Sequence, residues 1–489
     1  MSIVTSPLKP IVIESKVEKI NLKSRIVHIG FGAFHRAHQA LYTDEMLEKT
    51  GTDWGICEIN LFSHELIKQL RAQDHCYLVA EKGAEKTTVK MIAAIKESCH
   101  PHLDGIQTVL DKMAEKQVAI VSLTITEKGY CVDHATGQLD RKHSLIQHDL
   151  AHPSTPQSAI GYIVEALRLR RERGINAFTV MSCDNVQENG HIAKAAVLGF
   201  ANLLDKGLAQ WIESNVTFPC TMVDRIVPAA SSETLNEIAE LAGVYDPCAI
   251  ACEPFRQWVI EDDFVQGRPD WDVAGAEFVE DVVPFEEMKL RMLNGSHSFL
   301  AYLGYLGGYA HISDTMTNPD YRKAAFDMMI KAQAVTLNMP EGTDLEAYAH
   351  SLIERFSNPG LKHQTWQIAT DGSQKIPQRM GSSLRFHLKN GSDYRWLTLG
   401  IAGWMRYVGG VDEQGNKIEV RDPLAATFAT INAKYQYNED KVRALLSIET
   451  VFDKDLLENS GFVNNLIDTY QLITIKGASY AVALLSYHD

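Results

Sequence analysis

Continuously apolar runs alternate with segments of helical periodicity in the N-terminal part of the chain. A strand buried on both faces has an unbroken apolar sequence, and alternation of such strands with helices builds a parallel sheet. The strands predicted in this way are Ile26–Ile29, Trp54–Ile59, Ala119–Thr126, Ala177–Ser182 and Phe218–Val227, and the helices are His38–Lys49 and Ser158–Arg173. We therefore predict an α/β domain with a parallel sheet over residues 1–283.

Helical periodicity dominates from Pro284 onward. The predicted helices are Glu286–Tyr305, Tyr321–Asn338, Asp344–Phe356, Trp396–Tyr407 and Lys441–Leu446, followed by an apolar C-terminal stretch. Residues 265–283 are predicted to cross between the two domains. The second domain, residues 284–489, is therefore expected to be mainly α-helical.

Length, charge and hydropathy narrow the classes of function. A chain of 489 residues exceeds one ordinary hydrophobic core, which also favours two domains. The net charge of −15 argues against nucleic acid as a partner, since that needs a basic surface, although local arginines and lysines can still bind a small anion. No apolar run has the length of a membrane span, and the first residues are charged where a signal peptide is apolar. We expect a cytoplasmic protein with a small-molecule substrate and no membrane partner.

Cysteine and histidine spacing gives no sign of a metal site. None of the eight cysteines forms a C-x-x-C pair, and the 18 histidines include no H-E-x-x-H motif. Reduced structural thiols are the simplest interpretation of the cysteines. We expect no metal ion.

The glycine pair Gly30 and Gly32 directly follows the first predicted strand. Glycines at such a turn let backbone N–H groups approach a pyrophosphate at a helix N-terminus, although a tight turn without a ligand would have the same sequence. Where a third glycine is usual the chain has His35, and Arg36 and His38 follow. We expect these three side chains to contact the phosphates.

A dinucleotide-binding turn also needs an acidic residue after the second strand to bind the adenosine ribose. Glu58 is the residue available, although it lies farther along the chain than is usual. A carboxylate at this point would repel a 2′-phosphate, so it predicts NAD rather than NADP as the cofactor.

The segment from Glu286 to Tyr305 carries the clearest set of reactive side chains. On an α-helix, Lys289, Asn294 and His297 fall within an arc of about 140°, so they can point into one cleft. A solvated helix face is the alternative. Apolar residues surround the three positions, and a lysine in such surroundings loses solvation, which favours the neutral form that a general base needs.

Three further polar motifs follow predicted buried elements. "MSCDN" ends with Asn185, "MVDRIVP" contains Asp224 and Arg225, and "DGSQKIPQR" contains Lys375. Open α/β sheets bind ligands at the carboxyl ends of their strands, where the first two motifs are expected. Capping and ion pairing are the alternative roles.

Five motifs together resemble the mannitol dehydrogenase family of polyol-specific long-chain dehydrogenases, and the resemblance runs over nearly the whole chain. They are "GFGAFHRAH", "SLTITEKGY", "MSCDN", "FPCTMVDRIVP" and "KLRMLNGSH". The resemblance implies a Rossmann-type N-terminal domain, a helical substrate and catalytic domain, and metal-independent oxidation of a CH–OH group with NAD. It places the cofactor on Val27, Gly30, Phe31, Gly32, Ala33, Phe34, His35 and Arg36.

The same resemblance implies roles for individual residues. Lys289 is the catalytic acid and base, and Asn185 and Asn294 polarise the reacting oxygen. His297 orients the substrate. The residues implied to line the pocket are Asp224 and Lys375, and Glu286 is implied to relay protons.

The substrate implied within the family is a sugar acid, with interconversion of D-mannonate and D-fructuronate. Where mannitol dehydrogenases are expected to have an arginine, eight residues before Lys375, this chain has Gln367. A neutral polyol such as mannitol or arabinitol, the uronate tagaturonate, or a silent cofactor-sensing role remain alternatives. A carboxylate needs a cation, for which Arg379 and Arg406 are unassigned candidates. We expect a monomer or a small homo-oligomer.

Overall fold

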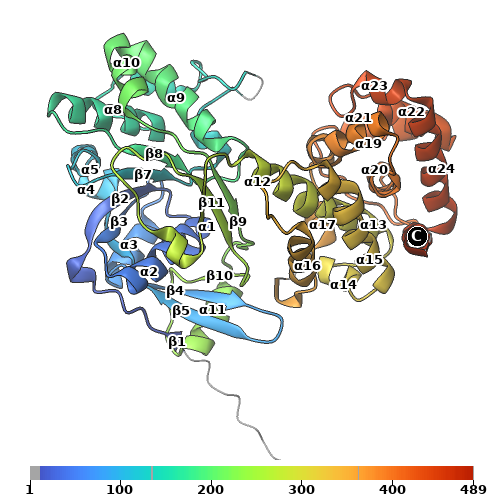
Figure 1. Ribbon diagram of the computed structural model, residues 1–489, viewed down its shortest axis with the longest axis horizontal. Coiled ribbons are helices and arrows are strands. Elements are labelled where there is room, and N and C mark those ends of the chain that lie inside the picture. Colours follow the sequence, from blue (N-terminus) through green and yellow to red (C-terminus); the bar gives the residue numbers. More distant parts are fainter. Residues whose placement is uncertain (1–11, 134–135, 362, 488–489) are drawn as a thin grey trace, which may run out of the picture. The chain divides into compact units, whose positions relative to one another are not determined.

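The chain divides into two compact units, Met1–Val283 and Pro284–Asp489, which are described separately below. The computed structural model describes residues 12–133, 136–361 and 363–487. Figure 1 labels the elements of each unit. No helix within these described ranges combines the length and the hydropathy that crossing a bilayer requires.

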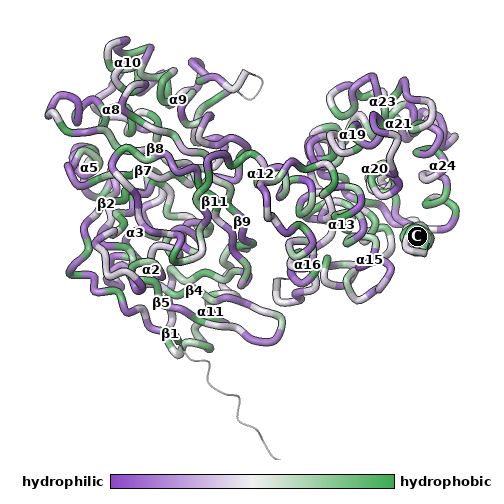
Figure 2. The backbone as a smooth tube through the Cα atoms, in the orientation of Figure 1, coloured by the Kyte–Doolittle hydropathy of each residue, from purple (hydrophilic) through white to green (hydrophobic). Residues whose placement is uncertain are grey.

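A parallel sheet of five strands forms the centre of the N-terminal unit (Figure 1). Its order is β6-β3-β2-β7-β8, so the chain starts in the middle and moves outward on both sides, as in doubly wound folds. The strands are β2 (Lys23–Ile29), β3 (Trp54–Ile59), β6 (Ile95–Cys99), β7 (Ile120–Leu123) and β8 (Thr179–Ser182). Every residue of β3, β7 and β8 is buried. Figure 2 shows how hydrophobic and hydrophilic stretches alternate along the backbone.

Helices connect these strands and pack around the sheet. Ser158 caps one of them by accepting a hydrogen bond from the Gly161 N–H at 2.9 Å, at the start that the sequence predicts. The helices are α1 (Ala33–Ala37), α2 (Gln39–Thr50), α3 (Glu65–Ala72), α4 (Pro101–Asp104), α5 (Ile106–Met113), α6 (Thr126–Gly129), α7 (Ser144–Ala151), α8 (Ala159–Glu172), α9 (Asn189–Leu204), α10 (Lys206–Asn215) and α11 (Ser232–Ala242). The predicted Rossmann-type α/β fold is confirmed.

Two smaller sheets complete the N-terminal unit and correct two predictions. Residues 265–283 do not simply cross between domains, because β12 within them pairs with β11. The strand of "MVDRIVP", β9, pairs antiparallel with β11 and belongs to this smaller sheet. The sheets are β1 (Val12–Ile13), β5 (Thr87–Ile92), β4 (Tyr77–Lys82) and β10 (Ile250–Cys252), and β12 (Glu277–Val279), β11 (Gln257–Glu261) and β9 (Thr221–Asp224).

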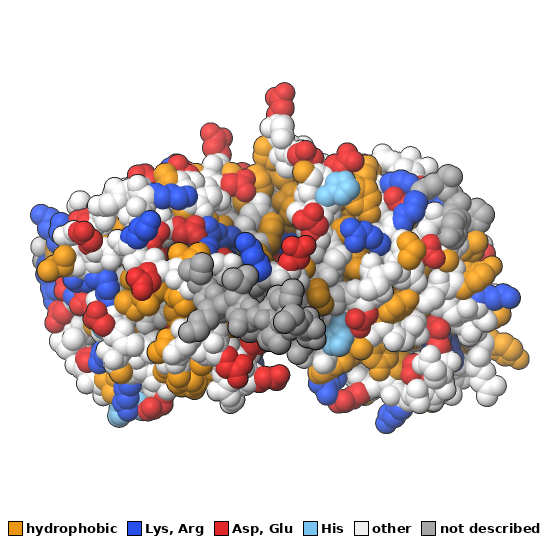
Figure 3. Space-filling view, turned by 90° about the horizontal axis from the view of Figure 1, so that it is seen from below, with side chains coloured by type: hydrophobic (Ala, Val, Ile, Leu, Met, Phe, Trp, Pro, Cys, Tyr) orange, Lys and Arg blue, Asp and Glu red, His pale blue; other side chains and the backbone are white. Residues whose placement is uncertain are grey.

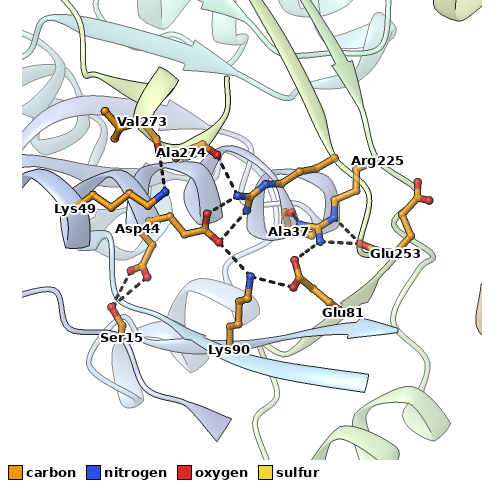
Figure 4. A network of polar contacts seen from close by, with 12 residues as sticks. Ser15, Ala37, Asp44, Lys49, Glu81, Lys90, Arg225, Glu253, Val273 and Ala274 are labelled. Atoms are coloured by element: carbon orange, nitrogen blue, oxygen red, sulfur yellow. Dashed lines mark hydrogen bonds and ion pairs between the residues drawn. The ribbon is translucent and has the colours of Figure 1, made fainter. Parts of the chain in front are cut away.

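Arg225, directly after β9, is a structural residue (Figure 4). Its buried guanidinium donates to the carbonyls of Ala37 at 2.6 Å and Glu253 at 2.9 Å, and it pairs with Glu81 at 2.5 Å. Lys90 continues the network from Glu81 to Glu45. Because every charge in this network has an opposite partner, it joins α1, β4 and β9 without leaving a buried charge unpaired.

The C-terminal unit is built from helices, as predicted, but three of its helical segments are π-helical. These are η3 (Lys289–Gly295), η4 (Met328–Gln333) and η7 (Pro377–Gly381). The α-helices are α12 (Val283–Met288), α13 (Ser296–Leu306), α14 (Ile312–Thr315), α15 (Pro319–Asp327), α16 (Leu345–Phe356), α17 (Thr365–Ile368), α18 (Gly372–Ile376), α19 (Ser382–Asn390), α20 (Arg395–Tyr407), α21 (Ala425–Lys434), α22 (Asn438–Leu446), α23 (Lys454–Glu458), α24 (Ser460–Lys476) and α25 (Ala478–Tyr487).

Surface charge is mixed rather than segregated. On the face drawn in Figure 3, acidic and basic side chains are interspersed among hydrophobic and neutral ones.

Candidate functional site

Gly30 at the end of β2 is required by the fold itself. Its φ of +115° is a conformation that residues with a side chain rarely adopt, and an added Cβ would lie 2.1 Å from the carbonyl oxygen of Thr124. The Gly30 N–H donates to the Ile59 carbonyl at 2.9 Å, and the Gly30 carbonyl accepts from Thr124 Oγ1 at 2.8 Å. The turn is therefore fixed against the ends of β3 and β7.

Gly32 has no such internal reason to be glycine. Its backbone is extended, it is exposed, and the nearest atom to an added Cβ is the Gly30 carbonyl oxygen at 3.8 Å. Space that the protein leaves open beside exposed backbone suits a ligand that must approach the backbone closely. The next residues of the predicted cofactor turn, Ala33 and Phe34, are also accessible, whereas Val27 and Phe31 are buried in the core.

His35, at the position where a third glycine is usual, is buried and stacks on the ring of His28. Its ring lies 3.4 Å from the ring of His28, centroid to centroid, with an angle of 12° between the planes. His35 Nε2 is 2.5 Å from Glu58 Oε1, and Nδ1 is 3.3 Å from Gln39 Oε1. A third glycine normally permits close packing of helix on strand. Here the stacked rings of α1 and β2 provide that packing.

The hydrogen bonds assign one proton to the pair of His35 and Glu58. Gln39 turns its amide nitrogen to His38, so its oxygen accepts from His35 Nδ1. His35 Nε2 then carries the lone pair, and the Glu58 carboxyl donates to it. Burial acts in the same direction, because it raises the pKa of Glu58 to about 8 and lowers the pKa of His35 to about 3.

These contacts correct the role predicted for Glu58. The side chain is fully buried and uncharged at neutral pH, so it neither faces a ribose nor repels a 2′-phosphate. His28, His35 and Glu58 are also the group that could hold a metal among the described residues. Stacked rings direct their lone pairs along nearly parallel planes, and each ring nitrogen already has a partner, so the geometry does not fit a metal ion.

The side chains of His35 and Arg36 lie inside the N-terminal unit and not on the outer side of the turn. The Arg36 guanidinium donates to the carbonyls of Cys248 at 2.5 Å and Gly32 at 3.2 Å. His38 Nε2 is 2.9 Å from the carbonyl oxygen of Gln257. Burial and these internal bonds occupy the three side chains, and their contact with phosphates stays a prediction.

"MSCDN" forms the carboxyl end of β8 and clamps the neighbouring strand end. The buried Asp184 carboxylate accepts hydrogen bonds from the N–H groups of Ile125 at 3.0 Å and Thr126 at 2.8 Å, and from the Tyr130 hydroxyl at 2.6 Å. Asn185, the next residue, is exposed at this edge. The loop held by Asp184 thus presents Asn185 where parallel sheets bind ligands. No sequence motif marked Asp184 for this role.

Asp224, at the end of β9, is buried. Asn189 joins this strand to the end of β8, because its amide accepts from the Thr221 N–H and donates to the Thr221 carbonyl, both at 2.9 Å. Asp224 therefore lies on a strand that is fixed to the β8 loop, although its strand belongs to another sheet.

Lys289 opens the π-helical segment η3, which changes the angular positions expected from an α-helix. In a π-helix the backbone bonds join residue i to residue i+5, so these two residues lie on one face. Lys289 and Asn294 are five residues apart and share η3. Their separation about the axis is therefore smaller than the α-helical arc predicts. Lys289 and Glu286 are both buried, and Asn294 is partly exposed.

His297 follows in α13 and faces aromatic and basic groups. Its ring stacks on Phe356 at 5.1 Å and lies 5.4 Å from the ring of His363. Burial, and then the neighbouring His363 and Arg379, hold the pKa of His297 well below its ordinary value. The ring is therefore neutral at physiological pH, and its buried Nε2 has no partner among the described residues.

Gln333, which the sequence did not single out, joins the three π-helical segments. Its amide donates to the Arg379 carbonyl of η7 at 3.0 Å and accepts from the Ser383 hydroxyl at 2.5 Å. An added Cβ on Gly295 of η3 would lie 2.8 Å from this amide nitrogen and 3.0 Å from the Arg379 carbonyl oxygen. One fully buried side chain of η4 thus sets the distance between η3 and η7.

Lys375 lies on α18, directly before η7. Its ammonium donates to the carbonyls of Thr370 at 2.5 Å and Ile368 at 3.2 Å. Burial, followed by nearby Arg379, lowers the pKa of Lys375 to about 8. Arg406 differs, because it donates to the Val411 carbonyl at 2.9 Å in the loop that follows α20.

A groove of about 400 Å³ along α20, α24 and α25 is separate from this set. Its lining, which includes Tyr394, Leu399 and Leu472, contains none of the predicted site residues.

We predict that Gly295→Ala lowers turnover, because the new methyl group must displace Gln333 or the backbone of Arg379. Such overpacking costs ~1–3 kcal/mol. The matched control is Gly381→Ala in η7, where the nearest atom to an added Cβ is 3.7 Å away. Steady-state kinetics should show a loss of about tenfold or more in kcat for Gly295→Ala only. Equal kcat in both variants would contradict the role given to this contact.

Comparison with known proteins assigns both units. Residues 24–273 match the mannitol dehydrogenase Rossmann domain, and residues 281–474 match the mannitol dehydrogenase C-terminal domain. The chain is 66% identical to D-mannonate oxidoreductase of Escherichia coli strain K12 over 467 residues, covering 95% of this chain and 96% of that protein.

Two solved structures are also similar. D-sorbitol dehydrogenase in substrate-free form superposes with a TM-score of 0.91 at 35% identity, covering 96% of this chain and 97% of that one. The ternary complex of Pseudomonas fluorescens mannitol 2-dehydrogenase with NAD and D-mannitol superposes with a TM-score of 0.80 at 36% identity, covering 98% and 97%. Motifs, fold and both domain matches agree, and the chain belongs to the mannitol dehydrogenase family.

Proposed function

We propose that this protein is an NAD-dependent oxidoreductase that interconverts D-mannonate and D-fructuronate. The observation that carries this proposal is the 66% identity over nearly the whole length to a protein named for D-mannonate. Lys289 and Asn294 on one face of a π-helical segment supply a base and an amide donor of the kind that such a reaction needs. A cytoplasmic location and a monomer or small homo-oligomer stay predictions.

The N-terminal turn fits a dinucleotide. Exposed Gly32 leaves open the space in which a pyrophosphate approaches the backbone. The relative solved with NAD supports NAD as the cofactor. When bound, NAD supplies the acceptor or donor of hydride. The protein then has to hold the substrate and move one proton.

Lys289 acts on that proton. In the oxidation direction its neutral amine accepts the hydroxyl proton, and in the reduction direction its ammonium returns the proton to the forming alkoxide. The Asn294 amide donates to the oxygen as negative charge develops on it, and this is strongest in the transition state. Neutral His297 can hydrogen-bond a substrate hydroxyl without adding charge. The roles of Asn185, Asp224 and Glu286 rest on the sequence resemblance and stay predictions.

A neutral polyol is the second candidate substrate, because the two solved relatives are named for sorbitol and mannitol. The exposed Gln367 stands where mannitol dehydrogenases are expected to have an arginine, which weakens an assignment to mannitol itself.

The substrate preference tests the proposal. We expect NADH-dependent reduction of D-fructuronate to exceed that of D-fructose by about 10²–10⁴-fold in kcat/KM, the value of a charge-assisted contact in a buried site. D-mannonate should likewise exceed D-mannitol with NAD. Comparable kcat/KM values for the acid and the neutral sugar would assign the protein to the polyol branch.

Replacement of the base tests the mechanism. Lys289→Ala should abolish turnover and leave the Kd for NADH unchanged, because the lysine acts on the substrate proton. Fluorescence titration and steady-state assays at neutral pH separate the two effects. More than about a tenth of the wild-type kcat in this variant would exclude the general-base role.

The two glycines of the turn should respond differently. Gly30→Ala should destabilise the fold by at least ~1–3 kcal/mol, because the residue is held at positive φ against Thr124. Gly32→Val should keep the wild-type Tm and weaken NADH binding about tenfold or more, since only a ligand occupies that space. Thermal unfolding and NADH titration measure both. Unchanged NADH affinity in folded Gly32→Val would remove this turn from the cofactor site.

A further inference from the structure

Arg379 in η7 is a half-buried cation with unused hydrogen-bonding capacity. Its Nη1 donates to the Asn294 carbonyl at 3.2 Å and to the Ser298 hydroxyl at 2.9 Å. An arginine side chain has five N–H donors in a planar fork. Within residues 12–133, 136–361 and 363–487, no other protein acceptor takes a hydrogen bond from this guanidinium, and no carboxylate pairs with it.

The surroundings of Arg379 are positive. Burial lowers the pKa values of His297 and Lys375, and the positive charge of Arg379 lowers them further. Lys375 bonds to backbone carbonyls and has no ion-pair partner among the described residues. Asp371 and then Asp422 raise the pKa of Lys375, but by less than burial and Arg379 lower it. The Asp422 carboxylate accepts hydrogen bonds from the N–H and the hydroxyl of Ser373 at 2.8 and 2.6 Å.

A positive cluster in a mostly buried place is stable only if an anion completes it or water reaches it. Burial lowers the pKa of Arg379 to about 10, so the guanidinium remains charged at neutral pH. A carboxylate fits the planar fork with two parallel hydrogen bonds. Arg225 and Arg256 pair with glutamates. The buried arginines Arg36 and Arg170 each donate to backbone carbonyls through two guanidinium nitrogens. Arg379 differs from all four because Nη1 alone of its nitrogens has a hydrogen-bond acceptor among the described residues.

The position of Arg379 relates this anion site to the reaction. Its Nη1 holds the backbone carbonyl of Asn294, whose side-chain amide is the proposed donor to the reacting oxygen. Gln333 fixes the η7 backbone at the same residue by donating to the Arg379 carbonyl. A hexuronate keeps its carboxylate a few bonds away from the reacting carbon, so one substrate can reach both groups.

We propose that Arg379, supported by Lys375, binds the carboxylate of the sugar-acid substrate and is the residue that makes the enzyme prefer an acid to a neutral sugar. This assignment rests on the proposed function. Arg406 is not assigned this role, because its guanidinium donates to the Val411 carbonyl in the loop after α20.

The test compares Arg379→Gln, Arg379→Lys and the matched control Arg406→Gln in NADH-dependent reduction of D-fructuronate and D-fructose. Arg379→Gln should lower the ratio of kcat/KM for D-fructuronate to kcat/KM for D-fructose by about 10²-fold or more, chiefly through the KM for D-fructuronate. Arg379→Lys should recover part of the loss, since it restores the charge without the fork. Arg406→Gln should leave both values unchanged.

The wild-type enzyme tests the proposed function, and the variants test the role of Arg379. The wild-type ratio of kcat/KM between acid and neutral sugar decides the proposed function, and a ratio near one overturns both proposals. If the wild type prefers the acid, the variants decide the role of Arg379. Loss of both activities by the same factor in Arg379→Gln, with an unchanged Tm, would show a structural role. An unchanged preference for the acid would place the carboxylate elsewhere.

Discussion

The buried amide of Gln333 is the contact on which the C-terminal unit's reactive groups depend. A π-helical turn is wider than an α-helical one and is rarely favoured by itself, so its neighbours must hold it. Gln333 contacts the segments of Gly295 and Arg379 with one amide group, whose donor and acceptor are both satisfied. The position of Arg379 relative to Asn294 is therefore fixed. A hydrogen bond of 3.2 Å from Arg379 Nη1 to the Asn294 backbone carbonyl also joins the two residues directly. Preorganisation of this kind is what a donor to a developing oxyanion requires.

The turn at Gly30 packs its helix against the first strand without the usual third glycine. A dinucleotide turn needs its helix close to the first strand, and a third glycine normally allows this. Here His35 stacks on His28 and shares a proton with Glu58, so helix and strand are joined by a neutral, buried group. The charge of Glu58 is thereby removed from the surface, which means that another feature must determine any preference between NAD and NADP.

Sequence patterns predicted the strands whose residues are all buried. The strands β3 and β8 and the start of α8 agree with apolar runs and with the cap at Ser158. The π-helical form of η3 was missed, because 100° per residue was assumed and nothing in the sequence marks a wider turn. Glu58 was misplaced because its exposure depends on His35, a contact made only in the folded sheet. Gln333 carries no motif, and its function follows solely from the segments that meet around it.

The most direct test is a crystal structure of the protein with NAD and D-mannonate bound. We predict two parallel hydrogen bonds from the Arg379 guanidinium to the substrate carboxylate. We also expect the reacting hydroxyl to lie within hydrogen-bond distance of Lys289 Nζ and of the Asn294 side chain. A substrate whose carboxylate lies away from Arg379, or whose reacting hydroxyl does not contact Lys289, would contradict these roles.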